Sequence, residues 1–244
     1  TLVVRGARLA PRSASSSNTR NHLAPNVSCG RAPHGSTVVI ADPETKVKLN
    51  DSAVGEIWVQ GPHVGQGYWQ LPADADDPFR ATLADGNGPY LRTGDLGYLE
   101  AGELFVTGRI KDTIIINGVK HNAEDIEFCA AQSHELFTGF SGAAFAIEWD
   151  GQERAVLIHE IERAQLNSDV LAKAVTDAFA SVTGKLGLRL FDLQLIRVGS
   201  LPRTSSGKVR RSQAREMYLM NSFKRLNRSD TLFPVSPMLN TAQH

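Results

Sequence analysis

The feature that most constrains the fold of this chain is a change of pattern at Lys111 and Asp112. Before this point, short β-rich segments alternate with turn residues such as those at 100–102, which is typical of a small β-barrel or sandwich. After it, segments with the strand period alternate with segments that have the helical period, which indicates a compact α+β or α/β domain. The sequence therefore predicts two structural units of different composition, with their junction near residue 111.

The expected boundaries follow from this change and from the C-terminal composition. We expect a β-rich unit at residues 1–110, a mixed unit at 111–227 and a tail or linker at 228–244, which contains Pro234 and Pro237. A polar stretch at 10–21 is expected to be a mobile loop. The expected strands are 1–4, 36–41, 56–60, 95–99, 103–107, 113–116, 142–149, 154–160 and 192–198. The expected helices run from an Asn122 cap to about Ser133, from Ser168 with Leu171, Val175, Ala178, Phe179 and Val182 on one face, and from Arg211 to Met220.

Composition excludes some classes of protein. No run approaches the roughly 18 apolar residues needed to cross a bilayer, and the first residues lack the pattern of a signal peptide. We therefore expect a cytoplasmic location and no transmembrane segment. Cys29 and Cys129 are isolated, with no histidine at ligand spacing, so we expect neither a disulfide framework nor a metal site.

The stretch 201–228 is strongly basic, although the chain as a whole has a formal net charge of zero. This stretch would attract anions, and a solvated surface, phosphate binding and docking of an acidic protein all remain open. Nucleic acid is disfavoured because only Tyr218 and Phe223 could stack on bases. The cations, against Glu216 alone, are Arg203, Lys208, Arg210, Arg211, Arg215, Lys224, Arg225 and Arg228.

Three polar, Gly-punctuated blocks carry the candidate chemistry: residues 91–97, 108–121 and 201–208. In the first, the carboxylate of Asp95 follows a Gly-containing turn and suits a vicinal diol such as that of a ribose. In the second, the planar guanidinium of Arg109 suits ribose or phosphate oxygens. In the third, a mobile Gly-rich loop would carry the ammonium group of Lys208 to a reaction centre. A Walker loop is excluded because Pro202 and Val209 stand where that motif needs Gly and Ser or Thr.

In this order, the three blocks resemble the signatures of the adenylate-forming enzymes, which include acyl-CoA synthetases, fatty acyl-AMP ligases and carrier-loading adenylation domains. The resemblance runs from about Gly55 to Arg211. It implies an α+β fold, in which the β-rich, barrel-like end of the adenylating N-domain precedes a small mixed α/β mobile C-terminal domain.

The resemblance also implies a role for each candidate residue. Asp95 and Arg109 would bind the nucleotide, and Lys111 would be the interdomain hinge. Gly118 would lie in the loop that lines the path of a phosphopantetheine arm. Lys208 would be the catalytic lysine, which stabilises negative charge during adenylation.

Residues 118–127 are most similar to the fatty acyl-AMP ligase branch, although Val119, Lys120 and Ala123 depart from its pattern. This branch uses ATP and Mg²⁺ to convert a fatty acid to an acyl-adenylate. It then passes the acyl group to an acyl carrier protein or a polyketide synthase carrier domain.

Nothing before Gly55 resembles the phosphate loop or acyl tunnel of such enzymes. We therefore expect the chain to be the C-terminal part of a longer enzyme and to be inactive alone. Two alternatives remain: a ligase with coenzyme A as acceptor, and a non-catalytic module that docks a carrier protein through the basic stretch.

Overall fold

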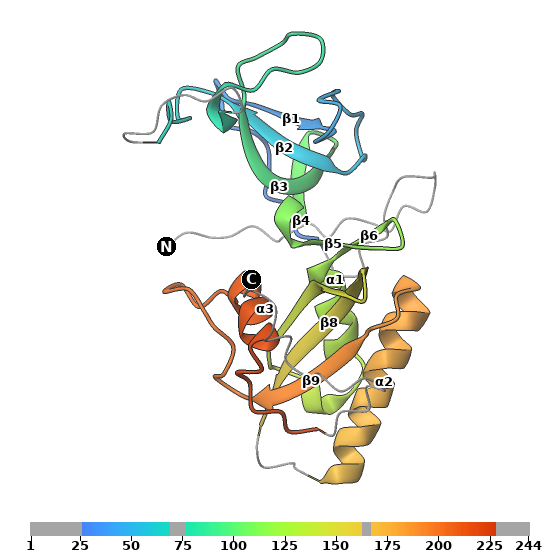
Figure 1. Ribbon diagram of the computed structural model, residues 1–244. Helices are drawn as coiled ribbons and strands as arrows, with labels where there is room; N and C mark the ends of the chain where they lie inside the picture. Colours follow the sequence, from blue (N-terminus) through green and yellow to red (C-terminus); the bar gives the residue numbers. More distant parts are fainter. Residues whose placement is uncertain (1–25, 69–76, 163–166, 228–244) are drawn as a thin grey trace, which may run out of the picture. The chain divides into compact units, whose positions relative to one another are not determined.

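The computed structural model describes residues 26–68, 77–162 and 167–227, shown in colour in Figure 1. These residues form two compact units that divide between Lys111 and Asp112, and each is described by itself below. The expected strand at 1–4, the loop at 10–21 and the tail at 228–244 lie outside the described residues. The fold class is α+β, as predicted.

The first unit is built on one four-stranded antiparallel sheet with the strand order β1-β2-β3-β4. One core cluster of this unit consists of Val39, Ala41, Trp58, Leu83 and Tyr90, which come from the sheet and from the segment before β3. The elements are β1 (Thr37–Ala41), β2 (Gly55–Gln60), the 3₁₀ helix η1 (Pro78–Arg80), β3 (Leu91–Glu100), β4 (Glu103–Arg109) and the 3₁₀ helix η2 (Ile110–Asp112), which crosses the division.

In its described residues, the second unit combines a short hairpin, a three-stranded sheet and three α-helices. Strands β7 and β8 are antiparallel, whereas β8 and β9 are parallel and are joined through α2, as a parallel connection requires. The elements are β5 (Thr113–Ile116), β6 (Val119–Asn122), α1 (Ala123–Ala131), the 3₁₀ helix η3 (Glu135–Phe137), β7 (Gly142–Trp149), β8 (Gln152–Ile161), α2 (Ser168–Leu186), β9 (Asp192–Arg197) and α3 (Arg211–Leu219).

Successive side chains of β7 point to opposite faces of this sheet, because the side chains of a strand alternate in direction. Ala143, Phe145 and Ile147 pack with Ala214 and Tyr218 of α3 in one core cluster. Of the intervening positions, Ala144 is buried, Ala146 is half-buried and Glu148 is exposed, and α1 packs against β7 with α2 beside it (Figure 1). The sheet is therefore covered on both faces.

Local sequence signals explain where the helices begin and end. The side chain of Asn167 caps α2 by accepting a hydrogen bond from the Asp169 amide at 2.9 Å, and Gly187 ends the helix in the left-handed conformation. Asn122 occupies the N-cap position of α1, as expected, but its side chain makes no capping hydrogen bond, and the helix ends at Ala131 rather than near Ser133. Within the described residues, no helix combines the length and the apolar character needed to span a bilayer.

Candidate functional site

Asp95 lies on a bulge inside β3, not in the turn that its Thr-Gly-Asp context suggested. Glu56 pairs with Leu96 and Trp58 pairs with Arg92, so three residues of β3 oppose the single residue Ile57 of β2. Gly94 adopts φ of +70°, which a residue with a Cβ rarely adopts. Such bulges redirect side chains at functional sites, and this one determines where the Asp95 carboxylate points.

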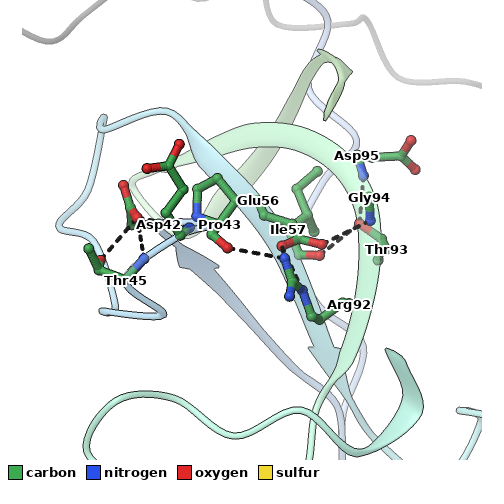
Figure 2. A network of polar contacts seen from close by, with 10 residues as sticks. Asp42, Pro43, Thr45, Glu56, Ile57, Arg92, Thr93, Gly94 and Asp95 are labelled. Carbon is green, nitrogen blue, oxygen red and sulfur yellow. Dashed lines mark hydrogen bonds and ion pairs between the residues drawn. The ribbon is translucent and has the colours of Figure 1, made fainter. Parts of the chain in front are cut away.

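Hydrogen bonds to β2 fix the shape of the bulge (Figure 2). The Thr93 hydroxyl donates to the Ile57 carbonyl at 2.7 Å and accepts from the Asp95 amide at 3.1 Å. The Gly94 amide donates to Oε1 of Glu56 at 3.1 Å. Figure 2 shows the Asp95 carboxylate directed away from this network. The bulge therefore satisfies its own backbone and leaves the carboxylate available to a ligand.

Glu56 is a residue that the sequence analysis did not single out. Its side chain is buried, and Oε2 accepts hydrogen bonds from Nε and an Nη atom of Arg92 at 2.9 and 2.7 Å. Arg92 also donates to the Pro43 carbonyl and lies over the ring of Trp58. Because Glu56 also holds the Gly94 amide, one buried carboxylate ties the bulge to the interior of the sheet.

Asp95 and Arg109 are brought together by the pairing of β3 with β4, in which they stand directly opposite each other. Oδ1 of Asp95 lies 2.7 Å from Nε of Arg109, and both side chains are partly exposed. A carboxylate oxygen has two lone pairs, so Asp95 can accept from ribose hydroxyls while it stays paired with the guanidinium. The pair thus presents acceptors and donors side by side on one edge of the first unit.

Lys111 and Gly118 occupy the positions expected for a junction and a tight turn. Lys111 lies in η2 and is the last residue of the first unit. Asn117 and Gly118 join β5 to β6 with φ of 50° and 75°, the geometry that an Asn-Gly hairpin turn adopts. A side chain at Gly118 would have no neighbouring atom within 4 Å. A side chain at Gly118 would therefore extend into space that its own unit leaves open.

Lys208 lies at the end of a closed turn within the second unit. Arg203 and Val209 form an antiparallel bridge, and the Thr204 amide donates to the Lys208 carbonyl at 2.8 Å. The Lys208 amide in turn donates to the Thr204 hydroxyl at 3.1 Å, and Gly207 has φ of +83°. The Gly-rich segment that the sequence suggested as a mobile loop is thus a hairpin-like turn with its own hydrogen bonds. Lys208 is exposed, and within residues 26–68, 77–162 and 167–227 its ammonium group has no recorded partner.

Arg211, at the start of α3, binds three carboxylates that the sequence pattern did not connect. It forms a two-pronged contact with Glu127 of α1 at 2.7 and 2.8 Å, contacts Asp112 at 2.8 Å and lies 3.6 Å from Glu124. Glu127 also accepts from the Ala144 amide of β7 at 2.9 Å. Arg211 therefore joins the residue after Lys111, the first helix, the sheet and the segment that follows Lys208.

Burial shapes the protonation behaviour of this cluster. Burial raises the pKa of Glu127, and the hydrogen bonds from Arg211 and from the Ala144 amide oppose that rise. For Arg211, burial alone would lower the pKa, but the hydrogen bonds and charge of Glu127, with Asp112 and Glu124, outweigh it and raise the pKa. The guanidinium is thus locked in its charged form.

Several cations of the basic stretch 201–228 are committed to internal contacts. Arg203 pairs with Glu160, Arg211 with Glu127, and Arg225 with the buried Asp192. Arg215 donates to the Ala146 carbonyl at 2.9 Å. Arg228 lies outside the described residues. The stretch is therefore less of an anion-attracting surface than its sequence suggests, which weakens the case for a module that docks an acidic protein.

Metal ligands do not gather anywhere in the described parts of the chain: no group of three or more His, Cys, Asp or Glu residues there could hold an ion. The two cysteines are free, Cys29 exposed and Cys129 buried.

Comparison with known proteins adds to this geometry. No protein-family profile matches the chain. JamA of Moorena producens, a medium-chain-fatty-acid–[acyl-carrier-protein] ligase, is 43% identical over 194 residues, which cover 79% of this chain and 33% of JamA. This chain is a relative of the C-terminal part of the fatty acyl-AMP ligases, within the adenylate-forming superfamily.

Two further matches support this relationship to fatty acyl-AMP ligases. FadD26 of Mycobacterium tuberculosis, a long-chain-fatty-acid–AMP ligase, is 42% identical over 205 residues, or 80% of this chain and 34% of FadD26. A solved structure from work on fatty acyl-adenylate ligases of E. coli and L. pneumophila shares the fold with a TM-score of 0.62 and 30% identity. The match covers 82% of this chain and 33% of the chain in the solved structure. The chain spans about a third of the length of the curated relatives it matches.

Proposed function

We propose that this chain supplies the ribose-binding pair, the hinge and the adenylating lysine of a fatty acyl-AMP ligase. The observation that carries the proposal is the cross-strand pair of Asp95 and Arg109, whose Oδ1 and Nε atoms lie 2.7 Å apart, with the Asp95 carboxylate directed away from the bulge network (Figure 2). The relatives JamA and FadD26 support fatty acids as the substrate class.

In the proposed first step, a fatty acid carboxylate attacks the α-phosphorus of ATP. A bond forms between the carboxylate oxygen and phosphorus, and the bond to the bridging oxygen of pyrophosphate breaks. Negative charge grows on the phosphoryl oxygens, and the ammonium group of Lys208 stabilises it. Asp95 accepts hydrogen bonds from the ribose hydroxyls while Arg109 donates to ribose or phosphate oxygens.

In the proposed second step, the thiol of a carrier protein attacks the acyl carbonyl, and AMP leaves. Rotation at Lys111 would exchange the lysine-bearing face of the second unit for the face that carries Gly118. A hinge requires backbone freedom at a few positions and no side-chain chemistry. The exposed Asn117-Gly118 turn would line the path of the phosphopantetheine arm.

ATP and Mg²⁺ are the cofactors of this proposal. The described residues offer no cluster of ligands for a resident metal, so Mg²⁺ would arrive bound to the phosphate oxygens of ATP. It would neutralise phosphate charge.

The experiment is a hybrid ligase, in which this chain replaces the matching C-terminal third of JamA. Octanoic acid, a medium-chain fatty acid, and ATP are supplied, and octanoyl-adenylate and pyrophosphate are measured. The proposal predicts adenylate formation within about tenfold of intact JamA, because the residues of the three blocks are present. A folded hybrid ligase that forms no adenylate would contradict it.

The acceptor is tested with the same hybrid ligase. Coenzyme A and a pantetheinylated carrier protein are supplied side by side, and the thioester products are quantified. The proposal predicts transfer to the carrier protein. Preferential transfer to coenzyme A would support the alternative acyl-CoA ligase and refute the carrier-protein assignment.

A further inference from the structure

The hairpin that carries Lys208 is anchored to a buried carboxylate. Glu160, near the end of β8, is only 1% exposed, although it carries a charge. Its Oε1 accepts from the Leu201 amide at 2.9 Å, and its Oε2 accepts from an Nη atom of Arg203 at 2.7 Å. Both carboxylate oxygens are therefore used to hold the start of the segment that leads to Lys208.

Arg203 extends this anchor to the residue before the lysine. While one Nη atom binds Glu160, the other donates to the Gly207 carbonyl at 3.1 Å. Arg203 also forms the antiparallel bridge with Val209 that closes the turn. The guanidinium thus connects a fixed point in the sheet with the far side of the hairpin.

Burial makes this contact different from an ordinary surface ion pair. The Arg203 side chain is 35% exposed, but that of Glu160 is almost completely removed from water. A buried carboxylate must be hydrogen-bonded, and charge-assisted hydrogen bonds hold geometry better than neutral ones. Both contacts of the Glu160 carboxylate link residues about 40 positions apart in the chain, so they hold the hairpin against the sheet.

We propose that Glu160 and Arg203 are positioning residues for Lys208 in the adenylation step. This proposal rests on the function proposed above. A lysine side chain has four rotatable methylene groups and no fixed direction, so the place of its backbone decides which atoms its ammonium group can reach. A displacement of about 1 Å in a catalytic group can reduce a rate by about a hundredfold.

The test is a double-mutant cycle in the hybrid ligase. Glu160→Gln and Lys208→Ala are made singly and together, and two rates are measured: adenylate formation from octanoic acid, and acyl transfer from preformed octanoyl-adenylate. We expect Glu160→Gln to lower adenylate formation by about tenfold to hundredfold and to leave acyl transfer within about twofold. In the Lys208→Ala background, Glu160→Gln should cause no further loss, because it acts through the lysine.

Two more variants separate positioning from stability. Asp192→Asn neutralises another buried carboxylate of the same unit, which binds Tyr218 and Arg225 and does not contact the hairpin. It should lower the melting temperature without changing the ratio of the two rates. Arg203→Lys keeps a cation beside Glu160 but loses the second Nη group that donates to the Gly207 carbonyl, so it gives a folded substitute if Glu160→Gln fails to fold, and it should lower adenylate formation alone.

The outcomes distinguish this inference from the proposed function. If Lys208→Ala lowers both rates equally, the role of Lys208 itself is wrong. If Lys208→Ala is selective for adenylate formation but Glu160→Gln and Arg203→Lys lower both rates, or lower neither, the positioning role is overturned. Additive losses in the double variant would also overturn it.

Discussion

Asp95 on β3 and Arg109 on β4 stand opposite each other in register, with Oδ1 of the carboxylate 2.7 Å from Nε of the guanidinium. Irregular pairing surrounds this arrangement: two additional residues of β3 form the bulge against β2, and a register shift between Leu96 and Gly97 follows in the pairing with β4. The two side chains can therefore bind one ligand together.

Replacing Asp95 with Ala should weaken nucleotide binding and leave the fold intact. Hydrogen bonds to a charged group contribute about 1.5–3 kcal/mol, so kcat/KM for ATP should fall by about tenfold to hundredfold in the hybrid ligase. Steady-state kinetics against ATP measure the effect. Asp51→Ala, at an exposed turn of the same unit, is the matched control and should leave the kinetics unchanged. Equal kinetics for the two variants would remove Asp95 from the nucleotide site.

Replacing Glu56 with Ala should destabilise the first unit. The variant leaves Arg92 without its carboxylate and the Gly94 amide without an acceptor, and breaking a largely buried pair costs about 3–5 kcal/mol. Since Arg92 is 31% exposed, we expect the lower end of that range. Urea unfolding measures the loss. Glu103→Ala removes a single bond to Ser28 in the same sheet and should cost about 1 kcal/mol, so a similar loss in both variants would contradict this role of Glu56.

Replacing Gly118 with Val should impair acyl transfer more than adenylation. Positive φ at Gly118 makes the substitution cost about 1–2 kcal/mol, and the added side chain would obstruct the proposed phosphopantetheine path. The matched control is Gly151→Val, because Asp150 and Gly151 join β7 and β8 in a turn of the same kind, with φ of 52° and 67°. Both variants should lose similar stability, and only Gly118→Val should slow transfer from preformed adenylate. Equal transfer rates in the two variants would refute the acceptor role.

Acidification should destabilise the second unit through His159. Burial lowers the pKa of this histidine, against smaller opposing effects of the Glu160 carbonyl and carboxylate. The unfolded chain therefore binds a proton more readily than the folded chain. The stabilisation that comes from neutral His159 is fully present above pH 6.5, the ordinary histidine pKa. It is lost as the pH falls through the lower pKa that this histidine has in the folded chain.

A variant isolates this contribution of His159. His159→Phe keeps an aromatic ring beside Phe137 but cannot titrate, so its free energy of unfolding should vary less between pH 6.5 and 5, by at most about 1.4 kcal/mol per pH unit. The exposed His34→Gln is the control and should retain the wild-type slope. Identical slopes for His159→Phe and the wild type would exclude His159 as the source.

The sequence predicts most elements of this fold because their signals are local. The apolar face of α2 appears in the spacing of Leu171, Val175, Ala178 and Val182, and all four are buried. The Asn117-Gly118 turn likewise needs no information from elsewhere in the chain. Phe179 was expected on the same face but is only half-buried.

The residues that hold the candidate site in place were not predictable in this way. Glu56 meets Arg92 across 36 positions, Glu160 meets Arg203 across 43, and Glu127 meets Arg211 across 84. Each pair is created by tertiary packing, and single glutamates and arginines in a sequence usually indicate a solvated surface. The bulge at Gly94 was also missed. A Thr-Gly-Asp turn and a Thr-Gly-Asp bulge have the same local sequence, and only the pairing of β3 with β2 distinguishes them.

The most direct measurement of the central claim is a crystal structure of the hybrid ligase with a non-hydrolysable acyl-adenylate analogue. The account predicts both ribose hydroxyls within about 3 Å of the Asp95 carboxylate and the Arg109 guanidinium beside the ribose or phosphate oxygens. A ribose held by other residues, with Asp95 and Arg109 remote from the ligand, would contradict it.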